Sequence, residues 1–104
     1  MVRQYFELQP QYDSHNSFYK KAFYVKSTDG KIIGLRSYGI DILEIVDGVL
    51  YRAFDKDSNI STTTMRHARD FIYQFYNSDE AFVKKVNKAF LLNLPKWGAG
   101  NENI

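Results

Sequence analysis

The sequence has no cysteine, only two prolines and no long hydrophobic run. Without cysteine, disulfides, thiolate metal sites and cysteine nucleophiles are excluded. The longest apolar runs, such as residues 89–92, are far shorter than the ~20 residues that a membrane span needs, and residues 1–5 lack the features of a signal peptide. We therefore expect a cytoplasmic protein with no membrane partner.

Neither sign of charge dominates, since 14 basic and 12 acidic residues give a net charge of +2. Composition alone therefore does not indicate a nucleic-acid-binding protein. Aromatic residues are abundant, at 16% of 104 residues, and large rings help a short chain to form a stable core. The length predicts one domain over residues 1–95, and the Gly- and Asn-rich residues 96–104 predict a flexible C-terminal tail.

The hydrophobic pattern predicts strands in the first half of the chain and helices in the second half. Strands are expected at residues 4–8, 18–26, 31–38, 40–46 and 49–54, with turns at Asp29-Gly30 and Asp47-Gly48. Helices are expected near residues 62–77 and 79–93, capped by hydroxyls of 61–64 and by Ser78. The predicted fold is α+β: an antiparallel β-meander of three to five strands followed by a helical hairpin packed on one face.

The first hairpin has two candidate registers. A two-residue loop at Asp29-Gly30 pairs Phe23 with Arg36 and mixes apolar and charged groups on each face. A three-residue loop pairs Phe23 with Leu35 and gives one apolar face, so we prefer it. In this register, five side chains share the other face: Lys20, Tyr24, Lys26, Arg36 and Tyr38.

Charge is divided between the two hairpins. Residues 14–40 hold five basic residues against one acidic residue, whereas residues 41–57 hold five acidic against two basic. In a surface of this kind, rings can stack on bases and the cations between them can neutralise phosphates. The same residue types are common in protein interfaces. A solvated sheet face without a partner can have the same composition. The candidate binding residues are Lys20, Tyr24, Lys26, Arg36, Tyr38, Arg66 and Arg69, and the candidate acidic surface is Asp41, Glu44, Asp47, Asp55 and Asp57.

Few residues are suited to catalysis or metal binding. Neither histidine, His15 or His67, has a further metal ligand four residues away. A triad of a hydroxyl, His67 and Asp70 can be drawn on the first helix, but polar residues on one turn are typical of an exposed helix face. Residues 55–59 begin like a calcium loop, but Ile60 stands where that loop needs Gly. We predict no enzyme activity, no catalytic residue, no metal and no cofactor, and strand alternation predicts that Asp41 and Glu44 lie on opposite faces.

Two short segments, residues 35–42 and 61–71, carry a family resemblance. The first contains a Ser-Tyr strand motif at Ser37-Tyr38. The second contains a Ser-x-Thr-Thr-x-x-His motif that opens a helix, at Ser61, Thr63, Thr64 and His67. In both motifs the chain resembles a small uncharacterised family carried by phages and plasmids of Gram-positive bacteria.

The resemblance implies an accessory protein in the cytoplasm of a bacterial host. Some proteins of this general kind are anti-CRISPR inhibitors of Cas9. The implied function is a non-enzymatic inhibitor from a mobile genetic element that binds a host defence nuclease, such as Cas9 or its guide-RNA complex, through charged, Tyr-rich surfaces. The alternative is a small phage or plasmid regulatory protein that binds RNA or DNA. We also expect His67 to hydrogen-bond to the sheet at Ser37 or Tyr38.

Overall fold

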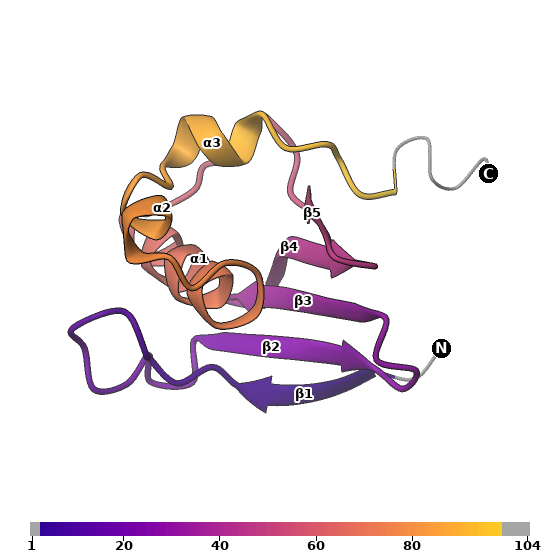
Figure 1. Ribbon diagram of the computed structural model, residues 1–104, viewed down its shortest axis with the longest axis horizontal. Helices are drawn as coiled ribbons and strands as arrows, with labels where there is room; N and C mark the ends of the chain where they lie inside the picture. The colour runs from indigo at the N-terminus through magenta and orange to yellow at the C-terminus, as the bar shows by residue number, and fades with distance from the viewer. Residues whose placement is uncertain (1–2, 99–104) are drawn as a thin grey trace.

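The computed structural model describes residues 3–98, which form a five-stranded antiparallel sheet followed by three helices. The strands are β1 (Arg3–Glu7), β2 (Ala22–Ser27), β3 (Ile32–Ser37), β4 (Ile40–Val46) and β5 (Val49–Arg52). The helices are α1 (Thr62–Phe75), α2 (Glu80–Lys84) and α3 (Lys88–Leu92). The strands lie in the sheet in chain order, which confirms the predicted meander and the α+β fold (Figure 1).

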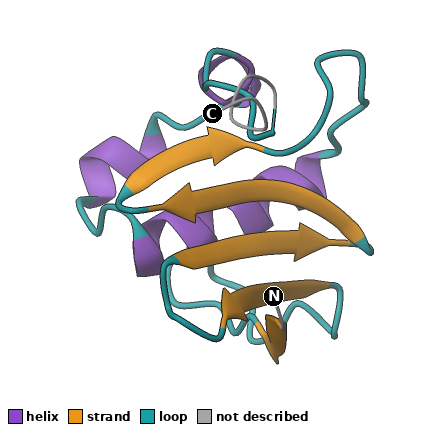
Figure 2. Ribbon diagram, turned by 90° about the vertical axis from the view of Figure 1, so that its right-hand side faces the viewer, coloured by secondary structure: helices purple, strands orange, loops and turns teal. Residues whose placement is uncertain are grey.

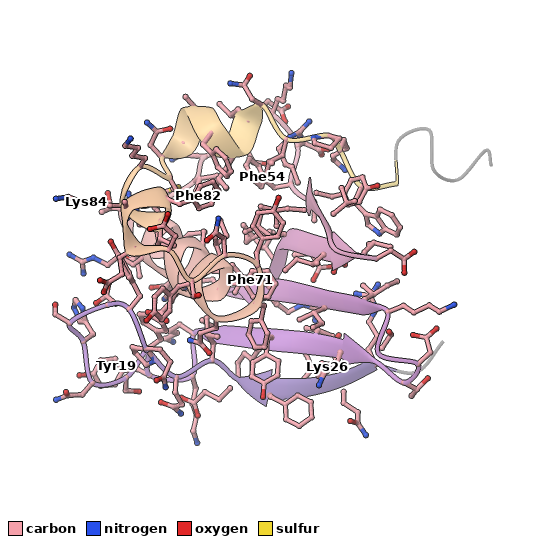
Figure 3. The ribbon with its side chains drawn as sticks, viewed as in Figure 1. Tyr19, Lys26, Phe54, Phe71, Phe82 and Lys84 are labelled. Atoms are coloured by element: carbon pink, nitrogen blue, oxygen red, sulfur yellow. The ribbon has the colours of Figure 1, made fainter. Side chains whose placement is uncertain are left out.

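The helices cover one face of the sheet and leave the other face open. Figure 2 shows the strands in front and the helices behind them, and therefore presents the open face. On the covered face, Leu35 and Leu43 pack with Phe71 of α1, whose side chain is fully buried between helix and sheet (Figure 3). This apolar layer provides most of the stabilisation, because each buried Leu or Phe contributes about 1.5–3 kcal/mol.

The register of the β2–β3 hairpin differs from the preferred prediction. Phe23 pairs with Arg36 and Tyr24 pairs with Leu35, so the predicted pairing of Phe23 with Leu35 is wrong. As a result, Tyr24 faces the helices, whereas Phe23 and Arg36 lie on the open face. The predicted common face of five candidate binding residues therefore does not form.

Side-chain hydrogen bonds at the turn explain this register. The N–H of Gly30, at φ +75°, donates to the Ser27 carbonyl at 3.0 Å. The Ser27 hydroxyl donates to Asp29 Oδ1 at 2.6 Å and accepts from the Ile32 N–H at 3.1 Å. These bonds stabilise a turn over residues 28–31, which is longer than the predicted three-residue loop. The resulting register pairs Phe23 with Arg36, so apolar and charged side chains share the open face.

A β-bulge changes which face the acidic residues of β4 occupy. Leu35 pairs with Leu43, but the next residue of β3, Arg36, pairs with Asp41. The extra residue in β4 breaks the alternation of side chains. Asp41 and Glu44 therefore lie on the same open face, which contradicts the prediction that they lie on opposite faces.

The helical region contains a break that the sequence pattern did not predict. The side chain of Ser61 caps α1, as expected, by accepting from the Thr64 N–H at 3.1 Å. The second predicted helix, residues 79–93, is instead divided into α2 and α3. Asn87 caps α3 by accepting from the Phe90 N–H at 2.9 Å, and Arg69 of α1 donates to the Val86 carbonyl at 2.9 Å. Both bonds occupy groups that a continuous helix would pair internally.

Residues 96 and 97, which the sequence assigns to the C-terminal tail, contact β5. Lys96 forms a parallel bridge with Arg52, and the N–H of Trp97 donates to the Arg52 carbonyl at 2.8 Å. The Trp97 ring packs on Tyr51 with 5.1 Å between centroids. These contacts place residues 96 and 97 beside β5. Residues 99–104 of the predicted tail lie outside the described part of the chain.

Candidate ligand-binding surface

Tyr38 stands where three surface hollows meet. Its side chain lines a hollow of about 480 Å³ on the open sheet face, a second of about 280 Å³ against α1, and a third of about 380 Å³ beside residues 58–61. Tyr38 is 52% exposed and directly follows the buried Ser37. The turn between β3 and β4 therefore places an accessible ring between sheet and helix.

The first hollow combines three cations with three aromatic rings. It lies at one end of β1, β2 and β3 on the open face, and it is lined by Tyr5, Phe23, Tyr38, Lys20, Lys21 and Arg36, together with Gly39. No ion pair involves the ammonium groups of Lys20 or Lys21 among residues 3–98. Both lysines are therefore available to an anionic ligand. The corrected register brings Phe23 into this hollow, because it places Phe23 opposite Arg36 on the open face.

Arg36 is held in position by an anion and a ring. Its Nε donates to Asp41 Oδ1 at 3.0 Å, and its guanidinium lies 5.0 Å from the centroid of the Tyr5 ring. The hydrogen bond to Asp41 holds the pKa of Arg36 above its ordinary value. A guanidinium fixed in this way contributes a planar, oriented donor to the hollow, and less net positive charge than the two lysines.

Around the hollows, three residues adopt the left-handed backbone conformation, which residues other than glycine rarely take. Tyr19, Lys20 and Tyr38 have φ angles of 53°, 60° and 52°. These left-handed residues turn the chain sharply before β2 and after β3, and the Tyr38 N–H donates to the Lys21 carbonyl at 2.8 Å. Such residues cost about 1–3 kcal/mol each and are concentrated at functional sites.

The second hollow lies between the loop before β2, the Tyr38 turn and α1. His67 of α1 lines it, although its side chain is only 1% exposed. The predicted bond to the sheet is confirmed, with 2.8 Å between His67 Nδ1 and Ser37 Oγ. Burial lowers the pKa of His67 to about 4, so the ring is neutral at physiological pH.

Asp70 is fully buried and has a structural role, which contradicts its expected place on an exposed face of α1. Its carboxylate accepts hydrogen bonds of 2.8–3.2 Å from the backbone N–H groups of residues 11–13 and one of 2.7 Å from the Gln74 amide. No hydrogen bond joins Asp70 to His67 within residues 3–98. A hydrolytic triad based on these two residues therefore does not form there.

The structure separates the seven candidate binding residues. Lys20, Arg36 and Tyr38 line the first hollow, and Arg66 lines the second. The other three lie elsewhere. Tyr24 packs between Phe6 and Phe75 on the covered face, Lys26 lies at the opposite end of β2 from Tyr19 (Figure 3), and Arg69 is bound to the Val86 carbonyl.

The acidic candidates do not form one surface. Glu44 is only 3% exposed and accepts from Arg3 Nη1 at 2.9 Å, so it is not available to a partner. Asp41 is paired with Arg36, and Asp55 lies 3.6 Å from Lys96. Only Asp47, in the turn after β4, and Asp57, in the loop after β5, are exposed without an ion pair among the described residues.

The carboxyl of Glu44 is an unusual feature of the open face. Its Oε2 is buried and has no hydrogen-bond partner among residues 3–98. Burial raises the pKa of Glu44, although the Arg3 hydrogen bond opposes this shift. Gly34 leaves the space that the carboxyl occupies, since a Cβ there would stand 2.2 Å from Oε2.

Sequence reasoning missed Tyr5, Lys21 and Phe23 as site residues. Phe23 was assigned to the apolar face because the wrong register was preferred. The rejected register pairs Phe23 with Arg36 and would have found it. Tyr5 enters the site because β1 pairs with β2 at Tyr5–Val25, and no local signal in the sequence fixes that pairing.

Within residues 3–98, no group of three or more His, Asp or Glu side chains could hold a metal ion. No helix in the same part of the chain is long and apolar enough to cross a membrane.

Residues 6–89 match a family described as a family of unknown function, DUF8033, and the chain belongs to that family. The matched region contains every residue that lines the first or the second hollow, except Tyr5. No curated protein and no solved structure matches the chain.

Proposed function

We propose that this protein binds single-stranded nucleic acid at the first hollow and catalyses no reaction. The observation that carries the proposal is the gathering of Lys20, Lys21 and Arg36 with Tyr5, Phe23 and Tyr38 around one hollow of the open sheet face. Rings stack on bases of any sequence, and ammonium groups neutralise phosphates. A base can stack on a protein ring only when it is not already stacked and paired within a duplex, so this surface favours a single strand.

The absence of catalysis is part of the proposal. Ser37 lies beside His67 in the arrangement of a nucleophile and a base, but its side chain is only 1% exposed. The Ser37 hydroxyl is engaged by Thr64 Oγ1 at 3.0 Å as well as by His67 Nδ1, and Ser37 lines neither of the first two hollows. The Ser37–His67 pair therefore supports the fold rather than a reaction.

A matched pair of double variants tests the binding proposal. We expect Lys20→Gln with Lys21→Gln to weaken binding of a fluorescent single-stranded 15-mer by at least about tenfold at low salt, because each lost phosphate contact reduces counterion release. The control removes two neighbouring exposed lysines, Lys84 at the end of α2 and Lys85 directly after it, which line neither of the first two hollows. Fluorescence anisotropy over a salt series measures both affinity and salt slope.

Two outcomes would contradict the proposal. Wild-type protein that binds no single strand at low salt would exclude it. So would an equal loss of affinity in the Lys84/Lys85 control, because binding would then follow total charge rather than the first hollow.

A second candidate is the nuclease inhibitor implied by the family resemblance: a mobile-element protein that acts in the bacterial cytoplasm on Cas9 or its guide-RNA complex. The exposed fractions of Tyr19, Tyr38 and Ile40, at 74%, 52% and 60%, favour a protein partner, since apolar and tyrosine side chains are typical of interface centres. Size-exclusion chromatography with guide-loaded Cas9 tests it. A stable complex, formed by protein that binds no free strand, would replace nucleic-acid binding as the proposed function.

A further inference from the structure

The second hollow is separate from the open sheet face and is bounded by a buried histidine. Lys21 and Tyr38 line both hollows and therefore connect them. His67, Arg66 and His15 line only the second. At about 280 Å³ it is close in size to small-ligand pockets, which pair apolar walls with a few convergent polar groups.

A chain of hydroxyl groups fixes the orientation of the His67 ring. The Ser61 hydroxyl accepts from the Thr64 N–H and donates to Thr64 Oγ1 at 3.2 Å. Thr64 Oγ1 lies 3.0 Å from Ser37 Oγ, which lies 2.8 Å from His67 Nδ1. We assign the direction in which Thr64 donates to Ser37 and Ser37 donates to His67 Nδ1, since Thr64 Oγ1 already accepts from Ser61 and its own proton is available to Ser37.

This direction determines the chemistry that His67 presents. A neutral imidazole that accepts at Nδ1 carries its proton on Nε2. Nε2 has no hydrogen-bond partner within residues 3–98, while the ring lines the hollow. His67 is thus a nearly buried, fixed donor without a partner.

Two cations accompany this donor. Arg66, one residue before His67, is oriented by its contact with His15, where 3.2 Å separates Arg66 Nη1 from His15 Nε2. His15 in turn contacts the Asp13 carboxylate at 2.5 Å. Burial pushes the pKa of Asp13 up, but hydrogen bonds from His15 outweigh it and hold this pKa below its ordinary value. Lys21 faces the same hollow and has no ion pair among the described residues.

We propose that the second hollow binds a phosphate monoester, held by the Nε2–H of His67, the guanidinium of Arg66 and the ammonium of Lys21. A monoester has one more ionisable oxygen than the diester linkages of a strand, and several oxygens to share among three donors. This proposal rests on the proposed function in one respect: a bound single strand would supply the monoester as its terminal phosphate. A free mononucleotide is the other source of the same group.

Single-stranded 12-mers of one sequence test the proposal, with a 5′-phosphate, a 3′-phosphate or hydroxyl ends. A hydroxyl-ended 14-mer controls for the added charge, because a terminal monoester adds about two negative charges. We expect wild-type protein to bind one phosphorylated 12-mer at least about fivefold more tightly than the 14-mer. Arg66→Gln should remove this preference while keeping the affinity for hydroxyl-ended strands, because Arg66 does not line the first hollow. Lys20→Gln should weaken all strands and keep the preference, because Lys20 lines only the first hollow.

Calorimetry with adenosine monophosphate, with adenosine as control, separates failure of this proposal from failure of the proposed function. Strand binding with no preference for phosphorylated ends, together with no monophosphate binding, would overturn the proposal and leave the proposed function standing. Monophosphate binding that Arg66→Gln abolishes, in protein that binds no strand, would support the hollow as a mononucleotide site and overturn the proposed function. A folded His67→Phe variant, which has no side-chain donor, with an unchanged preference would overturn the role given to Nε2.

Discussion

Gly34 lies beneath the carboxyl group of Glu44 in the middle of the open sheet face. A Cβ at this position would stand 2.2 Å from Glu44 Oε2 and 3.3 Å from the Leu43 carbonyl. The Glu44 side chain cannot move away easily, because it is buried and held by Arg3. At the scale of a residue, this glycine is therefore required by the space that a buried carboxyl occupies.

We expect Gly34→Ala to lower the free energy of unfolding by about 1–3 kcal/mol, the usual cost of overpacking. Shortening the opposing side chain with Glu44→Ala should remove most of that cost, because the space is then empty. Urea denaturation of both single variants and the double variant measures the coupling. An equal cost of Gly34→Ala in both backgrounds would show that the carboxyl is not the cause.

His67 gives the protein a defined loss of stability on acidification. Its pKa is about 4 in the folded protein, against an ordinary value of 6.5. Between these values the unfolded chain takes up a proton that the folded protein does not, so stability is present above pH 6.5 and is lost as the pH falls towards 4. We expect a loss on the order of 2 kcal/mol across this window.

His67→Gln should abolish this loss, since glutamine does not titrate, and thermal unfolding from pH 7 to 4 measures the difference between the two proteins. Wild type must be compared with His67→Gln because the raised pKa of Glu44 changes the stability with pH in the opposite direction. The folded protein binds the Glu44 proton more tightly than the unfolded chain does, so this contribution is lost as the pH rises. Parallel pH curves for wild type and His67→Gln would be inconsistent with a neutral buried His67.

At the scale of elements, the sequence was reliable where a signal is local. Asp47-Gly48 predicts a tight turn, and the structure pairs Val46 with Val49 across it. The hydroxyl of Ser61 predicts the start of α1 and provides its cap. In each case the residues that carry the signal are also the residues that form the structure.

The β2–β3 register and the helix over residues 79–93 were predicted wrongly. The β2–β3 register was chosen by requiring one apolar face, but the open face tolerates Arg36 beside Phe23 because Asp41 and Tyr5 accompany the guanidinium. The break between α2 and α3 depends partly on Arg69, which reaches Val86 from α1. Lys20, Arg36 and Tyr38 could be named from charge and composition, and Phe23 from the register that was not preferred. Tyr5 could be found only from the three-dimensional arrangement.

At the scale of the whole molecule, Asp70 joins α1 to the loop between β1 and β2. It lies in the middle of α1 and accepts from the backbone N–H groups of Gln11, Tyr12 and Asp13, nearly sixty residues earlier. The loop anchored in this way continues through residues 15–21, which supply one wall of each of the first two hollows. The binding surface therefore depends on a buried carboxylate that contacts neither hollow.

Asp70→Ala should lower the free energy of unfolding by about 3 kcal/mol, because it removes a buried carboxylate that accepts from three backbone N–H groups and the Gln74 amide. It should also speed hydrogen exchange of residues 11–20 beyond the rest of the domain, and weaken strand binding although no ligand contact is removed. Asp57→Ala, at an exposed position, is the matched control. If exchange in residues 11–20 stays at the wild-type rate while stability falls, Asp70 supports only α1, and the shape of the hollows must be fixed by the left-handed turns at Tyr19, Lys20 and Tyr38 instead.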